Sequence, residues 1–224
     1  MPLSFSTKAG TLAVLNGKLS HAQVPLSVFF QVSEWEEDGK GCLERIGREF
    51  QGDSFIVRSS CRREDGADSS NAGAFLSLAN VSTGDLEQSI LKVIDAYGEA
   101  DPCDEVLVQP MLENVVRSGV AFSHDPNTCS PYRVVNWTEG EDTAAVTGGL
   151  GGSVWQHAAS SPVDPPENLA DVFAMVEELY EFFGENPLDC EFAITSRDGE
   201  ELLWLLQARP LVLSRTSCAS SDQD

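Results

Sequence analysis

The sequence is poor in basic residues. It holds 14 Lys and Arg against 36 Asp and Glu, a formal net charge of −22, and only four of its residues are lysines. Nucleic acids and anionic membranes bind through basic patches, so we expect neither as a partner. An anionic ligand would have to be held by a few placed cations. Several arginines do lie close together in the segment 57–63, although ion pairs with neighbouring acids would explain that cluster equally well.

Cysteine motifs and long apolar runs are also absent. The six cysteines form no Cys-x-x-Cys pair and have no histidine at short spacing, so neither a zinc site nor a secreted disulfide framework is indicated. No stretch approaches 18 apolar residues, and the N-terminus lacks a basic and then apolar signal pattern. We therefore expect a soluble, cytoplasmic protein. The polar segment 213–224 is expected to be a disordered tail.

Helical and strand patterns alternate along the chain, and 42% apolar content is enough for a substantial core. We predict an α+β fold with two lobes of mainly antiparallel sheet, formed by residues 1–103 and 104–212. The periodicity places helices at about 7–19, 35–50, 82–97 and 165–183, and strands at about 24–32, 54–57, 74–81, 105–112, 119–123, 132–137, 154–157, 188–194 and 201–210.

Two apolar strands near the end of the chain carry a few polar side chains. In the first strand, a period of two places the carboxylates of Asp189 and Glu191 on one face. In the second, the same period places Gln207 and Arg209 on the face that also carries Leu205. A carboxylate beside an amide oxygen suits a hard cation such as Mg²⁺. A hairpin with a structural salt bridge is the alternative, and the pattern by itself favours it.

The register of this hairpin depends on its turn. A three-residue loop over Asp198–Glu200 would set Glu191 opposite Gln207 and Asp189 opposite Arg209. A two-residue Asp-Gly turn would shift the strands by one residue and break both pairs. We predict the first register, with Glu191 and Gln207 facing a cleft rather than the core.

Two loop segments are candidates for phosphate-binding sites. The strand 54–57 runs into Arg58 and a loop rich in Ser, Asp, Gly and Asn, whose side chains and backbone N–H groups could hold phosphates, although a solvated surface loop fits equally well. The glycine-rich segment 147–153 lacks the lysine and the spacing of a P-loop, so we interpret it as a turn. His124 and His157 stand alone, and no Gly-x-Ser-x-Gly motif is present, so Ser-His-Asp catalysis is not indicated.

Short motifs follow one another in a characteristic order along the chain. They are Thr7-Lys-Ala-Gly-Thr-Leu12, Val57-Arg-Ser-Ser60, Ala72-Gly73, Val108-Gln-Pro-Met111, Gly119-Val-Ala-Phe-Ser-His-Asp-Pro126, Asp189-Cys-Glu-Phe-Ala193 and Leu206-Gln-Ala-Arg-Pro210. This ordered set resembles the nucleotide-binding domain of the phosphoenolpyruvate synthase and pyruvate phosphate dikinase family, which has an ATP-grasp fold. Each motif is weak by itself, but the set covers nearly the whole chain to about residue 212.

The resemblance implies a site for ATP. Lys8 and Arg58 are similar to the family's phosphate-contacting cations, and Ala72 and Gly73 to part of its phosphate-covering loop. A hinge segment that meets adenine through backbone contacts corresponds to Gln109, Pro110 and Met111.

The resemblance also implies a metal site and a reaction. Glu191 and Gln207 match the positions that hold Mg²⁺, and Arg209 matches the position that contacts the transferred phosphates. Lys8, Arg58 and Arg209 would then be catalytic, because positioning and charge neutralisation supply most of the catalysis in phosphoryl transfer. The implied reaction moves a phosphoryl group from ATP to a histidine on a swivelling domain. A small-molecule acceptor such as pyruvate, a hydroxyl or a glutamine amide then receives it, and AMP and phosphate are by-products.

Two departures from the family pattern qualify these roles. Family members usually begin with Lys-Gly-x-Asn-Leu, whereas Lys8 is followed by Ala-Gly-Thr-Leu. The family's carrier histidine follows a Gly-Gly pair by three residues, whereas His157 is eight residues beyond Gly149, so we expect the carrier on another domain or chain. A nucleotide-binding regulatory module without transfer activity, and a structural domain that shares only the fold, are the alternatives.

Overall fold

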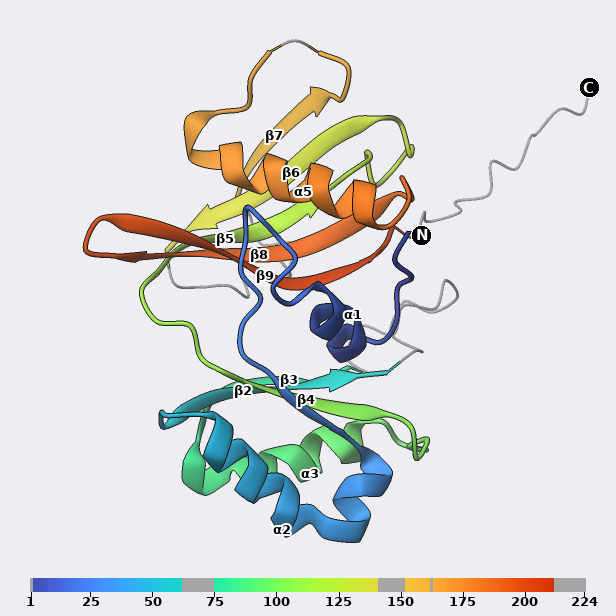
Figure 1. Ribbon diagram of the computed structural model, residues 1–224, viewed down its shortest axis with the longest axis vertical. Helices are drawn as coiled ribbons and strands as arrows, with labels where there is room; N and C mark the ends of the chain where they lie inside the picture. Colours follow the sequence, from blue (N-terminus) through green and yellow to red (C-terminus); the bar gives the residue numbers. More distant parts are fainter. Residues whose placement is uncertain (1, 62–74, 141–151, 162, 212–224) are drawn as a thin grey trace, which may run out of the picture.

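Two antiparallel sheets organise the part of the chain that the structure describes. The computed structural model describes residues 2–61, 75–140, 152–161 and 163–211. Figure 1 shows the two sheets one above the other, with helices α2 and α3 below the lower sheet and helix α1 between the sheets. The predicted α+β class with two mainly antiparallel sheets is confirmed.

The lower sheet in Figure 1 has the strand order β1-β4-β2-β3. Its strands are β1 (Val28–Gln31), β4 (Glu105–Pro110), β2 (Ser54–Ser60) and β3 (Ser77–Ser82). Helix α2 (Val32–Glu49), the short 3-10 helix η2 (Thr83–Asp85) and helix α3 (Leu86–Ala96) follow strands of this sheet. The apolar faces of the two α-helices and the sheet form one core, with Phe30, Ile46, Val57, Ile90 and Val106 among its most buried side chains.

The upper sheet has the strand order β7-β6-β5-β8-β9. Its strands are β7 (Ser153–Ala158), β6 (Tyr132–Glu139), β5 (Val115–Phe122), β8 (Leu188–Arg197) and β9 (Glu200–Pro210). The short 3-10 helix η3 (Glu167–Leu169) leads into helix α5 (Ala170–Phe182), whose apolar side chains pack with those of β8 and β9. None of the helices in the described ranges combines the length and apolarity needed to cross a bilayer.

The predicted boundary between residues 103 and 104 differs from the observed division into sheets. Strand β4 pairs with β1 on one side and β2 on the other, so residues up to Pro110 belong to the lower sheet. Helix α1 (Lys8–Leu15) instead shares the core of the upper sheet, and Gln23 is hydrogen-bonded to β9. The chain therefore crosses between the sheets twice, which a division into two consecutive halves could not represent.

The hairpin between β8 and β9 turns through two residues. Arg197 pairs with Glu200, and Asp198 and Gly199 between them have φ values of 55° and 85°. Two successive positive φ angles are typical of a type I′ hairpin turn, for which Asp-Gly is a favoured sequence. The predicted three-residue loop is therefore wrong.

A β-bulge at Leu206 restores the predicted register. Phe192 pairs with Leu205 and Glu191 pairs with Gln207, so Leu206 is an extra residue on β9. Beyond the bulge, Glu191 faces Gln207 across the strands and Asp189 faces Arg209. The predicted pairs are confirmed, although the bulge and not the turn produces them.

The bulge also changes which side chains share a face of β9. Leu203 and Leu205 are buried in the core beneath α5, and after the bulge Ala208 joins them there. Gln207 is therefore on the opposite face from Leu205, and our prediction that they share a face is wrong. The change points Gln207 away from the apolar core and toward the lower sheet, where it meets the side chain of Arg58.

Candidate functional site

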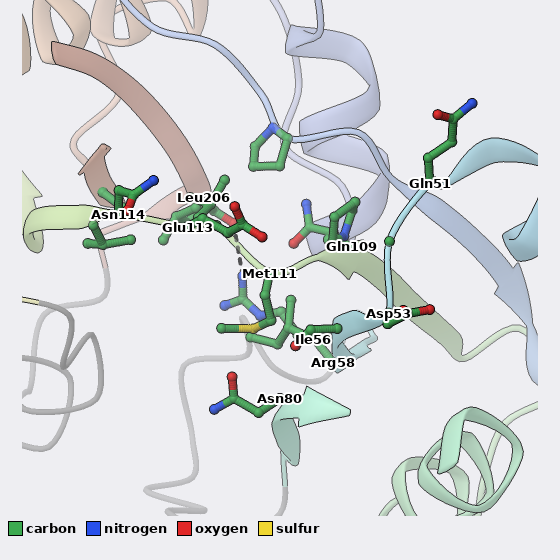
Figure 2. Close-up of a pocket in the computed structure, with 17 residues that line it drawn as sticks. Gln51, Asp53, Ile56, Arg58, Asn80, Gln109, Met111, Glu113, Asn114 and Leu206 are labelled. Atoms are coloured by element: carbon green, nitrogen blue, oxygen red, sulfur yellow. Dashed lines mark hydrogen bonds between the residues drawn. The ribbon is translucent and has the colours of Figure 1, made fainter. Parts of the chain in front are cut away.

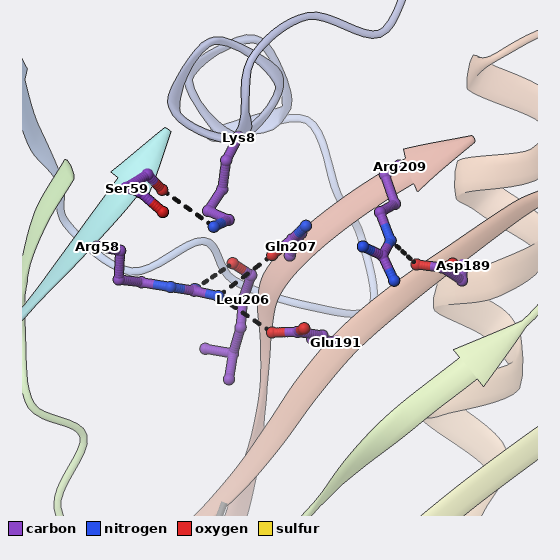
Figure 3. Close-up of polar contacts among 8 residues, drawn as sticks. All are labelled: Lys8, Arg58, Ser59, Asp189, Glu191, Leu206, Gln207 and Arg209. Carbon is purple, nitrogen blue, oxygen red and sulfur yellow. Dashed lines mark hydrogen bonds and ion pairs between the residues drawn. The ribbon is translucent and has the colours of Figure 1, made fainter. Parts of the chain in front are cut away.

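Arg58 joins the two sheets. It lies on β2 of the lower sheet, and its side chain is 9% exposed. Its Nη2 donates to Glu191 Oε2 at 3.1 Å and to Gln207 Oε1 at 3.2 Å, as Figure 3 shows. One nitrogen atom thus contacts a carboxylate oxygen and an amide oxygen from neighbouring strands. These two oxygens converge on a single point that holds positive charge.

The backbone at the bulge supplies a third bond to the same guanidinium. Arg58 Nη1 donates to the carbonyl oxygen of Leu206 at 3.1 Å. A bulge leaves its extra residue out of the regular ladder, so the backbone groups there are available for other partners. The bulge therefore sets the register of Glu191 and Gln207 and also offers a carbonyl to the cation between them.

Lys8 approaches the same region from α1. Thr7 is the N-cap of this helix, and its hydroxyl accepts a hydrogen bond from the backbone N–H of Gly10 at 3.1 Å. Lys8 is the first helical residue and is buried, and its Nζ donates to the carbonyl oxygen of Ser59 at 3.0 Å. Figure 3 shows Lys8 extending from its helix to Ser59, and Arg58 extending from the neighbouring position of β2 to Gln207 and Glu191. The two cations expected to contact phosphate are therefore brought together.

Arg209 is held by an ion pair within the hairpin. Its Nε donates to Asp189 Oδ1 at 2.8 Å, and the Asp189 side chain is buried whereas that of Arg209 is about half-exposed. The alternative of a structural salt bridge is thus realised for Asp189 and Arg209. It does not account for Glu191, whose ion pair is made to Arg58 of the other sheet.

Two buried polar atoms in this region have no hydrogen-bond partner among the residues that the structure describes. They are Nε of Arg58 and the hydroxyl oxygen of Ser59. A buried polar group without a partner costs free energy, so such atoms are uncommon in folded proteins. Both atoms belong to neighbouring residues of β2, and the carbonyl of Ser59 accepts from Lys8, so unpaired polar groups and a buried cation occur in one segment, as expected where a polar ligand binds. Ser59 lies within the motif Val57-Arg-Ser-Ser60, but no role was predicted for it.

The oxygens of Glu191 and Gln207 fit a site for Mg²⁺ that is completed by a ligand. Both are hard donors, and they lie on neighbouring strands and contact the same nitrogen of Arg58. No group of three or more His, Cys, Asp or Glu residues suited to a metal occurs in the described part of the chain. Mg²⁺ commonly takes one or two protein oxygens and completes its shell with waters and phosphates, so two donors are sufficient.

A cavity of about 840 Å³ adjoins Arg58. The segment that connects β4 to β5 forms one wall, and Ala193 and Leu206 contribute from the upper sheet. Figure 2 shows Met111 and Ile56 beside Arg58, with polar side chains around them. The hinge residues expected from the resemblance all line this cavity, namely Gln109, Pro110 and Met111.

The hinge residues are partly engaged by the protein itself. The side-chain amide of Gln109 is buried and donates to the hydroxyl of Ser27 at 2.9 Å. The backbone N–H of Met111 donates to the carbonyl of Ser54 at 3.0 Å. Several polar residues of the cavity wall were not predicted, because they lie on separate loops and strands with no shared motif; they are Gln51, Asp53, Asn80, Glu113 and Asn114.

Three predictions fall outside the described residues. Ala72 and Gly73, expected in a phosphate-covering loop, lie there, and so does the expected tail 213–224. Most of the glycine-rich segment 147–153 lies there too, and only Gly152 and Ser153 are described. The site is therefore built from the cations, the hinge and the hairpin alone.

Several solved structures are similar to this one in the path of the backbone, at low sequence identity. D-Alanine-D-alanine ligase from Helicobacter pylori is 14% identical with a TM-score of 0.47, and the match covers 92% of this chain and 54% of that one. L-Amino acid ligase from Bacillus licheniformis is 12% identical with a TM-score of 0.49, covering 91% and 42%. Macrocyclase MdnC from Microcystis aeruginosa, solved with its precursor peptide MdnA, is 13% identical with a TM-score of 0.48, covering 91% and 52%.

These values concern the path of the backbone and say nothing about ligands. The chain spans about half the length of the structures that it resembles. No family model and no curated protein sequence matches it. A function for this chain therefore has to be inferred from the residues of the site.

Proposed function

We propose that this chain is an ATP-grasp nucleotide-binding domain that holds Mg²⁺-ATP between its two sheets. The observation that carries the proposal is the convergence of Glu191 and Gln207 on one nitrogen of Arg58, beside a cavity lined by the hinge. The cleft would then offer, in order, the oxygens of Glu191 and Gln207 to a cation, the side chain of Arg58 to phosphates, and the cavity to the base. The order of the sequence motifs supports the same assignment.

The base would occupy the cavity against the hinge. Met111 cannot offer its backbone N–H without giving up the bond to Ser54, so we assign that contact to the residues that follow it. Leu112 and Glu113 also line the cavity and continue the hinge toward β5. Ile56 and Met111 provide the apolar surface that a planar base requires.

The phosphates would lie between the cations of α1 and β2 and the hairpin. Lys8 and Arg58 would neutralise their charge, and Glu191 and Gln207 would hold Mg²⁺, which supplies further charge neutralisation when bound. Asp189 fixes the Nε side of Arg209, so the guanidinium is oriented before a phosphate arrives. Such preorganised charge is the main contribution a protein makes to phosphoryl transfer.

The reaction that we propose is of the dikinase type. ATP would phosphorylate a histidine on a separate swivelling domain, which would pass the phosphoryl group to a small-molecule acceptor, with AMP and phosphate as by-products. This assignment is supported by the ordered motifs, which end in Gln-Ala-Arg-Pro at 207–210. His124 and His157 lie on the upper sheet and its loop without the spacing of a carrier histidine.

Binding is tested first by thermal unfolding. A ligand at about 100 times its Kd adds about 2.7 kcal/mol to the folded state, so saturating Mg²⁺-ATP should raise the Tm by roughly 5 to 10 °C. Glu191→Ala should lose most of this rise, whereas Glu87→Ala, on the exposed side of α3, should keep it. An unchanged Tm of the wild-type protein in millimolar Mg²⁺-ATP would contradict the proposal.

The products then identify the reaction. With a carrier-histidine domain and an acceptor present, we expect AMP and a phosphohistidine detectable by mass spectrometry. ADP formed only with amino acids would instead indicate the ligase chemistry named for two of the similar solved structures. Binding of ATP with no turnover under either condition would leave the regulatory module as the function.

A further inference from the structure

The carboxylate of Glu105 links the beginning of α1 to the end of β2. Its Oε2 accepts a hydrogen bond from the hydroxyl of Thr7 at 2.6 Å and from the hydroxyl of Ser60 at 3.2 Å. Thr7 is the N-cap of α1, and Ser60 is the last residue of β2. Lys8 immediately follows Thr7, and Ser59, whose carbonyl accepts from Lys8, immediately precedes Ser60. The carboxylate therefore fixes both ends of the contact made by Lys8.

Further hydrogen bonds close this connection into a network. The backbone N–H of Ala9 donates to the hydroxyl of Ser60 at 2.9 Å. The backbone N–H of Ser60 donates to the hydroxyl of Tyr97 at 2.8 Å, and that hydroxyl donates to the backbone carbonyl of Glu105. Thr7 and Ser60 are buried, so these bonds are shielded from water and retain their strength.

The network crosses from one sheet to the other. Ala9, Leu12 and Leu15 of α1 are part of the core of the upper sheet, whereas Glu105 and Ser60 belong to the lower sheet. Leu107 of β4 is a lower-sheet member of the same core. The carboxylate of Glu105 attaches the first turn of α1 to the lower sheet, which also carries Arg58.

The charge of Glu105 suits its position. Lys8 stands at the N-terminus of α1, where the helix dipole disfavours a cation, and the first turn of the helix contains no acidic residue. Glu105 brings a carboxylate to that end from β4, 98 residues away in sequence from Thr7. This explains how an otherwise unfavourable lysine can be held at the start of the helix.

We propose that Glu105 is a positioning residue that holds Lys8 in register with Arg58. It acts through Thr7 and Ser60 and does not itself contact the nucleotide. The placement of Lys8 follows from the contacts above, and its consequence for ATP rests on the proposed function. The experiment therefore has one arm without nucleotide and one arm with it.

The first arm measures the reactivity of Lys8 in the nucleotide-free protein. Lys18, Lys40 and Lys92 are exposed, so a lysine acetylating reagent followed by peptide mass spectrometry compares one buried lysine with three internal references. Glu105→Ala should speed acetylation of Lys8 by about tenfold, the effect expected for losing a strong hydrogen-bonded contact, and leave the other three unchanged. Glu105→Gln keeps an acceptor oxygen and should lie between Glu105→Ala and the wild type.

Buried thiols separate local release from general unfolding. Cys42 and Cys190 are buried, and burial raises the pKa of both thiols, so both should stay unreactive in Glu105→Ala if only the α1 contact is lost. Unchanged acetylation of Lys8 in this variant would overturn the proposal. Thiol exposure that rises in step with Lys8 acetylation would also overturn it, because Glu105 would then serve general stability.

The second arm measures the Kd for Mg²⁺-ATP in a double-mutant cycle with Lys8→Met. If Glu105 acts through Lys8, Glu105→Ala should weaken binding by about tenfold in the wild-type background and have no further effect in Lys8→Met. Additive losses would overturn the positioning role. If the wild-type protein fails to bind Mg²⁺-ATP, the proposed function fails, while the acetylation result still decides whether Glu105 holds Lys8.

Discussion

Three arginines of this protein are equally buried and differ in what surrounds them. Arg58, Arg117 and Arg133 are each 8% exposed. Arg117 donates to two carboxylates, and the carbonyl of Asn168 also accepts from it. Arg133 makes a two-pronged ion pair with Glu177. These partners belong to the upper sheet and to the helices η3 and α5, and the two arginines lie on strands of that sheet.

Arg58 is held in another way. Its partners are one carboxylate, one amide oxygen and one backbone carbonyl, all on the opposite sheet. Its Nε has no hydrogen-bond partner within the described residues. Burying a guanidinium costs desolvation energy that close pairing must offset, and here the pairing is incomplete. Arg117 and Arg133 are thus paired within the upper sheet and its helices, whereas Arg58 pairs across the two sheets, in keeping with the ligand-binding role that we propose for it.

The largest difference in turnover is expected between variants of Glu191, the carboxylate partner of Arg58, and Glu201, a carboxylate partner of Arg117. Glu191→Ala removes an oxygen proposed to hold Mg²⁺ and leaves Arg58 without its counter-ion, so turnover should fall by roughly 10² to 10³. Glu201→Ala removes a partner of Arg117 outside the cleft and should keep the wild-type rate. Rates are measured as AMP release with carrier domain and acceptor present. A wild-type rate in Glu191→Ala would remove Glu191 from the site.

The arginines themselves should separate binding from stability. Arg58→Ala removes charge-assisted donors from the cleft and should raise the Kd for Mg²⁺-ATP by about 10- to 100-fold. Arg133→Ala, equally buried but distant from the hinge cavity, should bind with the wild-type Kd. Isothermal titration calorimetry at a temperature where all variants are folded measures both. Equal Kd values for the two variants would contradict the proposal that Arg58, unlike Arg133, binds the nucleotide.

Without nucleotide, Arg133→Ala should lower the free energy of unfolding more than Arg58→Ala does. Arg133→Ala loses the ion pair to Glu177, the bond to the carbonyl of Ser123 and the contact with the ring of Tyr180. Because Glu177 is about half-exposed and regains water, we expect a loss of about 2 kcal/mol in the free energy of unfolding, measured by urea denaturation. The variant should still gain the full rise in Tm from Mg²⁺-ATP. A missing rise would show that the Arg133 network supports the cleft.

The residues of the cleft could be predicted from the sequence better than the turns, bulges and strand pairings that bring them together. The predicted register placed Glu191 opposite Gln207, although through a loop that the structure does not contain. The ordered motifs assigned Lys8 and Arg58 to one site, and Lys8 does contact the carbonyl of Ser59, the neighbour of Arg58 on β2. The bulge at Leu206 could not be predicted, because nothing in an apolar run of leucines marks the residue that leaves the ladder. Local patterns identify which residues alternate, but tertiary contacts decide where the alternation is interrupted.

The path of the chain between the two sheets was missed for a similar reason. Residues 105–110 read as one strand among several, and only pairing shows that this strand inserts between β1 and β2. Glu105 was missed because its partners, Thr7 and Ser60, are distant in sequence and belong to no shared motif. Long-range partners of polar residues are the part of a site that a single sequence does not contain.

The smallest expected effect is a pH dependence of the folding stability, caused by His124 near Arg133. Burial lowers the pKa of His124, and the charge of Arg133 lowers it further, from the usual value of 6.5. The unfolded chain therefore binds more protons than the folded protein as the pH falls below about 6.5, so stability decreases in that range and is unaffected by His124 above it. The urea midpoint should fall less between pH 7.5 and 5.5 in His124→Gln than in the wild type. Arg133→Ala removes one cause of the lowered pKa and should also reduce the fall, whereas Arg58→Ala should not change it.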